Sequence, residues 1–165
     1  MPRRGFLNRR VRLTHAAGLL SAAADVADAV AILRDHARVI AAADGITIVR
    51  REGDEVSYVA EDAMTPLWTG QRFPLTKCVS GLALLAGEPI LIGDIRNDPR
   101  VPLNAYLSTF VLSVAMFPIG RTAAVGAYWK DAGPIDPEAV ELMAELAEAA
   151  KQIFDPDAPP ILRAG

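Results

Sequence analysis

Two amphipathic helices, one toward each end of the chain, most constrain what this sequence can fold into. The first is predicted from about Asp25 to Ala43, and its apolar stripe steps by four and three along Val26, Val30, Leu33, Ala37 and Ile40. The second is predicted from about Asp136 to Phe154, with a stripe of Val140, Met143, Ala147, Ala150 and Phe154. Exposed apolar area is unfavourable in water, so both stripes need a surface to cover. The segment between the helices must supply that surface.

The middle of the chain has the pattern of an antiparallel sheet. Two β-rich runs, 46–51 and 55–60, are joined by Glu52-Gly53-Asp54, which predicts a tight hairpin. Further strands are predicted at 90–92, 113–119 and 123–130, and short helices at 80–85 and 103–111. Small residues in the last two strands leave room for a close-packed helix or for a ligand. The order of elements predicts an α+β fold, with a central antiparallel sheet and both long helices on one face.

Both long helices carry more apolar surface than one sheet contact requires. Ile32 and Val39 point away from the main stripe of the first helix. Leu142, Leu146 and Ile153 widen the stripe of the second. The additional surface predicts a neighbouring helix, from this chain or from a second copy. Our hypothesis is a homodimer whose interface includes all five residues.

Length and composition indicate one domain flanked by two short segments. The chain has 165 residues, a formal charge of −3 and 52% hydrophobic residues, enough to close a core. Residues 25–154 are the predicted domain, 1–24 a basic N-terminal arm that could include a short helix, and 155–165 a proline-bearing tail. The arm's arginines predict a mobile, solvated segment, with contact to an anionic membrane or acidic partner as the alternative. Asp25 and Asp28 interrupt its apolar run, so we expect no signal peptide, no membrane span and a cytoplasmic protein.

Few side chains are available for metal or covalent chemistry. The one cysteine, Cys78, cannot form an internal disulfide or a multi-thiolate metal site. His15 and His36 are expected to be isolated and solvated, without a triad or a metal. A pI of about 5.4 argues against a general nucleic-acid-binding role, which usually needs a basic face. Small molecules or proteins are the expected partners.

A set of short motifs adds a family resemblance over about Asp25 to Phe154. In chain order they are Phe73-Pro74-Leu75, Ser80-Gly81, Gly87-Glu88-Pro89-Ile90, Gly93-Asp94-Ile95, Asp98-Pro99-Arg100-Val101-Pro102, Ser113 through Ile119, and Gly126-Ala127-Tyr128-Trp129. Together they resemble a GAF domain, of the type found in bacterial histidine kinases and related signalling proteins. The resemblance implies a sensory module with dimerising helices on one face of the sheet and a ligand pocket on the other. A signal would pass to a separate protein, because no output domain follows in this sequence.

The candidate ligand-binding residues combine that implied pocket with side chains suited to it. They are Trp68, Phe73, Cys78, Asp94, Arg96, Tyr106, Ser113 and Tyr128. Ordinary packing is an equally good explanation for the aromatic residues. Asp94 and Arg96 also fit turn structure. Cys78 fits either a small buried apolar residue or a redox-sensitive thiol near a helix start.

The residues that enzymatic and cofactor-binding versions of the resembled fold require are not found in this sequence. Covalent bilin binding needs a cysteine near Pro102-Leu103, where none occurs. Reduction of free methionine sulfoxide needs a catalytic and a resolving cysteine. The residues typical of cyclic-nucleotide GAF domains are also not found, which disfavours a nucleotide ligand without excluding it. We therefore expect a non-enzymatic, homodimeric sensor in signal transduction, whose small-molecule ligand or cofactor the sequence does not identify. The alternatives are a ligand-free dimerisation or interaction module and, less favoured, a redox sensor or small enzyme using Cys78.

Overall fold

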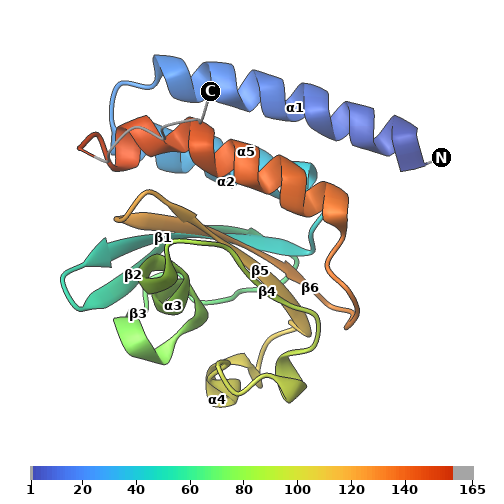
Figure 1. Ribbon diagram of the computed structural model, residues 1–165, viewed down its shortest axis with the longest axis vertical. Helices are drawn as coiled ribbons and strands as arrows, with labels where there is room; N and C mark the ends of the chain where they lie inside the picture. The colour runs from blue at the N-terminus through green and yellow to red at the C-terminus, as the bar shows by residue number, and fades with distance from the viewer. Residues whose placement is uncertain (1, 158–165) are drawn as a thin grey trace, which may run out of the picture.

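The computed structural model describes residues 2–157 of the chain (Figure 1). The helices are α1 (Pro2–Ala22), α2 (Val26–Ala41), α3 (Val79–Ala86), α4 (Leu103–Tyr106) and α5 (Pro137–Phe154), with 3₁₀ turns at Leu75–Lys77 and Ile95–Asn97. The strands are β1 (Gly45–Glu52), β2 (Glu55–Ala63), β3 (Arg72–Pro74), β4 (Ile90–Ile92), β5 (Ser113–Ile119) and β6 (Ala123–Trp129). The predicted long helices and hairpin are confirmed. The helix expected over 103–111 is wrong beyond Tyr106, where the chain turns toward β5.

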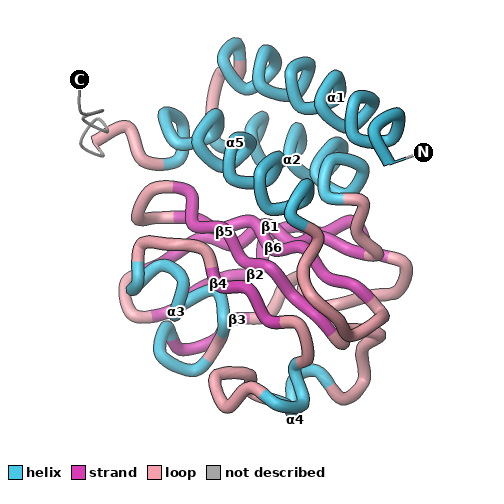
Figure 2. Tube along the Cα trace, turned by 45° about the vertical axis from the view of Figure 1, so that its right-hand side comes forward, coloured by secondary structure: helices cyan, strands magenta, loops and turns pink. Residues whose placement is uncertain are grey.

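The strands form one antiparallel sheet in the order β3-β2-β1-β6-β5-β4. In β1 the side chains alternate between the two faces, as the pleat of a strand requires. Ile46 and Ile48 join the core beneath α2 and α5, whereas Val49 joins a second core on the opposite face. The sheet is therefore covered on both sides (Figure 2).

Helix α5 begins as local capping rules predict. The Asp136 carboxylate accepts a hydrogen bond from the Glu138 backbone N–H, and Pro137 occupies the first turn of α5. The first long helix, predicted to run to about Ala43, ends slightly earlier, at Ala41, and its C-cap Ala42 is left-handed with φ of 50°. Gly45 begins β1, where an added Cβ would lie 2.8 Å from the Ala63 Cβ. Glycine is needed there for close approach between strands.

The N-terminal segment is a helix packed on the domain, and the prediction of a mobile arm is corrected. α1 lies across α2 and α5 and forms an outer helical layer (Figure 1). Among its described side chains, those of Leu13, Ala16 and Leu20 are buried. Met1 and the side chains of Arg3 and Arg4 lie outside the described part of the chain. Within residues 2–157, no helix has the length and apolar character needed to cross a membrane.

Part of the predicted dimer surface is occupied by α1 within the chain. Leu142 and Leu146 are fully buried and share one core with the apolar residues of α1, so we correct their assignment to a surface between two copies. Val39 remains 48% exposed, while Ile32 and Ile153 are half-buried beside this core. The additional apolar side of α5 thus meets a helix of the same chain, one of the two alternatives that the pattern left open.

The C-terminal end of α5 is fastened to the β5–β6 turn. Asp155 is buried and accepts hydrogen bonds from the Arg121 backbone N–H at 2.8 Å and from its Nε at 3.0 Å. The Thr122 hydroxyl donates to the carbonyl oxygen of Phe154. The predicted tail therefore begins with an ordered residue, and its part beyond Asp157 lies outside the described residues.

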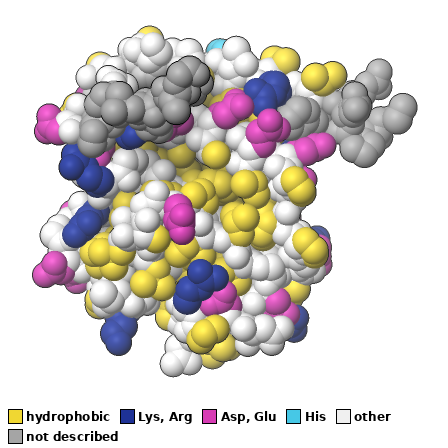
Figure 3. All heavy atoms as spheres, viewed as in Figure 1, with side chains coloured by type: hydrophobic (Ala, Val, Ile, Leu, Met, Phe, Trp, Pro, Cys, Tyr) yellow, Lys and Arg dark blue, Asp and Glu magenta, His cyan; other side chains and the backbone are white. Residues whose placement is uncertain are grey.

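In the view of Figure 3, hydrophobic side chains gather across the middle of the molecule, with a few charged side chains among them and others toward the rim. The large apolar side chains left exposed include Leu85 of α3, at 53%, and Leu91 of β4, at 43%.

Candidate functional site

Aromatic side chains from separate elements meet on the face of the sheet opposite the long helices. Tyr58 of β2 packs edge to face on Trp68, with ring centroids 5.6 Å apart, and on Phe73, at 5.5 Å. Trp68 also contacts Tyr106 of α4 at 4.7 Å and Tyr128 of β6 at 5.3 Å. We call these five side chains the aromatic site. Such edge-to-face contacts add to the stabilisation that burial alone provides.

Hydroxyl groups pair beneath the aromatic site. The Thr47 hydroxyl lies 2.9 Å from the Tyr128 hydroxyl, and the Tyr58 hydroxyl lies 3.1 Å from that of Ser80. The Ser80 hydroxyl in turn lies 3.4 Å from the Cys78 Sγ. Burial raises the pKa of Tyr58 and of Tyr128, so both phenols stay protonated and can donate hydrogen bonds. The site therefore combines apolar walls with neutral polar groups.

Glu61 fixes the loop that carries Trp68. Its carboxylate accepts hydrogen bonds from the backbone N–H groups of Leu67, Trp68 and Thr69, at 2.7 to 3.0 Å, and from the Thr69 hydroxyl at 2.7 Å. Burial alone would raise the pKa of Glu61, but these hydrogen bonds to the charged form outweigh it and lower the pKa. Trp68 is thus positioned by an ionised carboxylate at the end of β2.

The aromatic site is almost completely filled by its own side chains. Its hollow measures ≈ 10 Å³ and is lined by Tyr58, Trp68, Phe73, Cys78, Pro102, Ala105 and Tyr106. A single water molecule needs roughly this volume. Gly126 contributes to the close packing, because an added Cβ would lie 2.6 Å from the Tyr128 hydroxyl. In this strand, the space beside a small residue is used for packing.

Five of the eight predicted ligand-binding residues come together here, and three lie elsewhere. Trp68, Phe73, Cys78 and Tyr106 line the hollow, and Tyr128 packs against Trp68. Asp94 forms an exposed ion pair with Arg96, 2.9 Å long, and also caps a 3₁₀ turn through the Arg96 backbone N–H. These two residues therefore follow the turn-structure alternative. Ser113 is the third predicted residue that lies outside the aromatic site.

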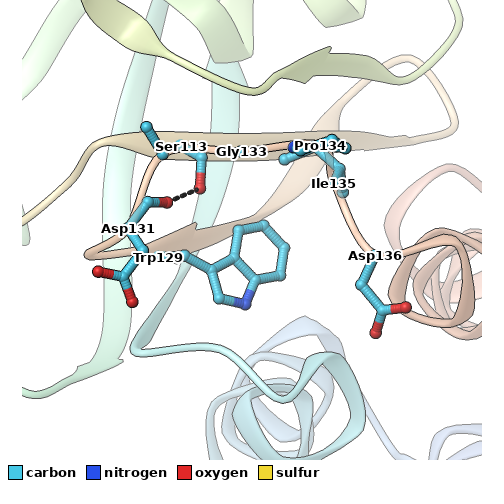
Figure 4. Close-up of a pocket in the computed structure, with 8 residues that line it drawn as sticks. Ser113, Trp129, Asp131, Gly133, Pro134, Ile135 and Asp136 are labelled. Carbon is cyan, nitrogen blue, oxygen red and sulfur yellow. Dashed lines mark hydrogen bonds between the residues drawn. The ribbon is translucent and has the colours of Figure 1, made fainter.

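Ser113 belongs to a separate hollow of ≈ 200 Å³ where β6 leads into α5 (Figure 4). Its hydroxyl donates to the Asp131 carbonyl oxygen at 2.9 Å. The other lining residues are Trp129, Asp131, Ala132, Gly133, Pro134, Ile135 and Asp136. The Trp129 indole lies between this loop and α2, where its Nε1 donates to the Ala42 carbonyl oxygen. This second hollow is larger than that of the aromatic site. Its lining combines an apolar wall with two acidic residues, Asp131 and Asp136.

The sequence interpretation missed several residues of the aromatic site. Tyr58 and Ser80 supply hydroxyl groups, Glu61 positions Trp68, and Ala105 accepts a hydrogen bond from the Trp68 Nε1 at 2.9 Å. The alternation of β2 could have indicated Tyr58, which has the same parity as Val56, a core residue of the same face. No local signal distinguishes the Ala105 carbonyl, because its role depends on a residue 37 positions away.

Cys78 is a buried thiol with neutral polar neighbours. Besides Ser80, its Sγ lies 3.6 Å from the Pro74 carbonyl oxygen. Among residues 2–157, no group of three or more His, Cys, Asp or Glu side chains could hold a metal ion. The arrangement is thus suited to noncovalent binding or packing.

His15 and His36, expected to be isolated, are neighbours in the structure. Their rings lie edge to face across the α1–α2 contact, with centroids 5.5 Å apart. The docking of α1 brings them together, which is why the sequence spacing did not indicate it.

These features define a class of small α+β domain. One antiparallel sheet carries a layer of terminal helices on one face and a cluster of loops and short helices with a small hollow on the other. The chain belongs to the GAF family, since the family model described as "GAF domain" matches residues 23–155. The resemblance inferred from its motifs is confirmed.

Solved structures agree with this assignment at the level of the fold. The GAF domain of a phosphoenolpyruvate-protein phosphotransferase from Coxiella burnetii has a TM-score of 0.78 at 15% identity, covering 90% of this chain and 93% of its own. The free methionine-R-sulfoxide reductase from Neisseria meningitidis, solved with its substrate, has a TM-score of 0.73 at 18% identity, covering 89% and 88%. A search of curated proteins gives no match. Structural neighbours thus include both a domain of a larger protein and an enzyme.

Proposed function

We propose that this GAF domain is a non-enzymatic sensory module that binds a small molecule at the aromatic site. The observation that carries the proposal is the meeting of Tyr58, Trp68, Phe73, Tyr106 and Tyr128 around a buried set of hydroxyl groups. Apolar walls with a few placed polar groups are typical of small-molecule sites. A ligand with a flat apolar body and one neutral polar group fits this chemistry.

Binding requires the aromatic site to open, because ≈ 10 Å³ holds no organic ligand. Two segments close it, the loop carrying Trp68 and the segment around α4. One hydrogen bond, from Trp68 Nε1 to the Ala105 carbonyl oxygen, joins them directly. A ligand that replaces this contact would favour an open arrangement by its higher affinity for that state.

The sheet offers a route from the aromatic site to the helices. On one face of the sheet, Tyr128 packs against Trp68. The next residue of β6, Trp129, donates a hydrogen bond from its Nε1 to the carbonyl oxygen of Ala42 at the end of α2. A shift of β6 would therefore reach the helical layer. We propose that this layer passes the signal to a separate partner and forms a homodimer through the surface that includes Ile32 and Val39.

We do not propose a reductase role, because a thiol-based reductase needs a second thiol to regenerate the first. Reduction of a sulfoxide by a thiol ends in an oxidised cysteine that a second thiol must resolve. Cys78 is the one cysteine of the sequence. A thiol supplied by another molecule would be needed to complete such a cycle.

A second candidate function, a ligand-free interaction module, has one observation in its favour. The aromatic site is filled by its own side chains, as expected of a domain that uses only its surface. In that case the cluster would act as the core of the second face, and the helical layer would carry the function.

Native mass spectrometry of the purified protein, combined with NMR, separates the two functions. A sensor is expected to carry a noncovalent mass, or to show shifts of the Trp68 indole signal when phenol and indole are added as probes. Trp129, on the other face of β6, supplies the internal control signal. A protein with no bound mass and an unmoved Trp68 signal at millimolar probe would overturn the sensory proposal and favour the interaction module.

A further inference from the structure

α1 is held on the rest of the protein by three arginines as well as by its apolar face. The Arg9 Nε donates to the Ile40 carbonyl oxygen at 2.8 Å, and Arg9 also pairs with Asp136. Arg10 pairs with Glu145 at 3.0 Å. Arg12 makes the remaining contact, to α2. Each arginine thus reaches a different part of the surface below α1.

The contact of Arg12 with α2 depends on the protonation state of a histidine. The Arg12 Nε donates a hydrogen bond to the Nδ1 of His36 at 2.7 Å, and its guanidinium also donates to the Asp35 carbonyl oxygen at 3.3 Å. A guanidinium has donors and no acceptor. The Nδ1 of His36 must therefore carry a lone pair, which requires the neutral imidazole. A proton on Nδ1 would replace this hydrogen bond by the repulsion of two cations.

The other charged groups around His36 act mostly in the same direction. Burial, the charge of Arg12 and that of His15, in this order, lower the pKa of His36, and the opposing effect of Asp35 is smaller. α5 also packs against α1 and α2. Its acidic residues that face α1 pair with the other two arginines: Glu138 with Arg9, and Glu141 and Glu145 with Arg10.

We propose that α1 is a pH-sensitive cover of the α2–α5 layer, docked while His36 is neutral and loosened when His36 gains a proton. With α1 undocked, His36 returns toward its ordinary pKa of about 6.5 and binds a proton more readily. Docking is therefore strongest above that pH and weakens as the pH falls through the lower value of the docked state. This inference stands on the helical layer alone and is independent of ligand binding at the aromatic site.

Loosening α1 would uncover part of the main core. Leu13, Ala16 and Leu20 of α1 share that core with Leu142 and Leu146 of α5. An apolar surface of this kind favours association once exposed. The state of His36 thereby controls whether the helical layer is closed within one chain.

Hydrogen exchange of the full-length protein tests the proposal at about pH 7.5 and about pH 5.5, on either side of the ordinary histidine value. Protection factors, corrected for intrinsic exchange, are compared between α1 and the central strands β1 and β6. We expect α1 protection to fall several-fold, and by no more than about tenfold because pH 5.5 lies about one unit below the ordinary histidine value, with the strands unchanged. The variant His36→Asn keeps an acceptor near the Nδ1 position and does not titrate, so its α1 protection should change by less than about twofold.

A second variant separates the proposed contact from a general effect of pH. Arg12→Gln removes the guanidinium, so α1 should be less protected at about pH 7.5, and its protection should depend less on pH. NMR titration should also give a higher His36 pKa in this variant. Equal α1 protection at both pH values in the wild type, or an equal fall in His36→Asn, would overturn the proposal.

Discussion

Trp68 and Ala105 connect the two segments that close the aromatic site. The Trp68 Nε1 donates to the Ala105 carbonyl oxygen at 2.9 Å, across 37 residues of sequence. Trp68 lies between β2 and β3, and Ala105 lies in α4. Because both residues line the hollow with Cys78, we expect this hydrogen bond to limit access to that thiol and to the hydroxyl groups behind it.

Replacing Trp68 tests this control. Trp68→Phe retains an aromatic ring but leaves the Ala105 carbonyl without its donor, and should lower the free energy of unfolding by about 1 to 3 kcal/mol in urea denaturation followed by circular dichroism. Opening of the site should also speed the reaction of Cys78 with a thiol reagent several-fold. Trp129→Phe is the control, since it removes a similar hydrogen bond, to Ala42, on the helical side. Equal thiol reactivity in the two variants would contradict the role of Trp68.

Glu61→Gln should loosen the loop before β3. One carboxylate oxygen is replaced by an amide donor facing backbone N–H groups, so we expect a loss of about 1 to 2 kcal/mol in the same assay. Because the pKa of Glu61 is lowered by folding, its contribution is present above the ordinary glutamate value of about 4.3 and is lost as the pH falls through the folded value. The variant should therefore lose less stability than the wild type on acidification below that value. Glu148→Gln, on the exposed side of α5, should behave as the wild type in both respects.

Asp155→Asn should detach the end of α5 from the β5–β6 turn. The Arg121 side chain and backbone hydrogen bonds lower the pKa of Asp155, so the carboxylate is ionised and stabilising above the ordinary aspartate value of about 3.9. A neutral amide accepts these hydrogen bonds less strongly, and we expect Tm to fall by about 4 °C at neutral pH. Asp157→Asn, two residues on and exposed, is the matched control. An unchanged Tm in both variants would show that the contact adds nothing to stability.

Charges on the α2 surface that includes Ile32 and Val39 test the proposed homodimer. Val39→Asp, or Ile32→Glu, should give monomers with the circular dichroism of the folded protein, because a charge at an apolar interface must lose its hydration. Light scattering after size-exclusion chromatography measures the mass. Leu107→Asp on the far side of the molecule, where the side chain is 77% exposed, should not change the oligomeric state. A dimer that survives both α2 substitutions would exclude this interface.

Which residues belong to the aromatic site was largely predictable from the sequence, whereas the space between them was not. Trp68, Phe73, Tyr106 and Tyr128 are predicted as candidate pocket residues from their aromatic side chains and from the pocket that the resemblance implies, and the fold brings them together. Whether they enclose space was not predictable. That depends on packing among five elements, and here the rings leave a hollow of only ≈ 10 Å³.

The sequence by itself determined the α+β class, the helices α2 and α5, and the hairpin, since these follow from periodicity and turn chemistry within a few residues. Only the tertiary structure decided where α1 docks. The N-terminal segment has only a weak amphipathic pattern. The position of α1 depends on contacts such as Arg12 with His36, 24 residues away, and Arg9 with Asp136, 127 residues away. The energy of such contacts exists only after the chain has folded, so no local pattern records it.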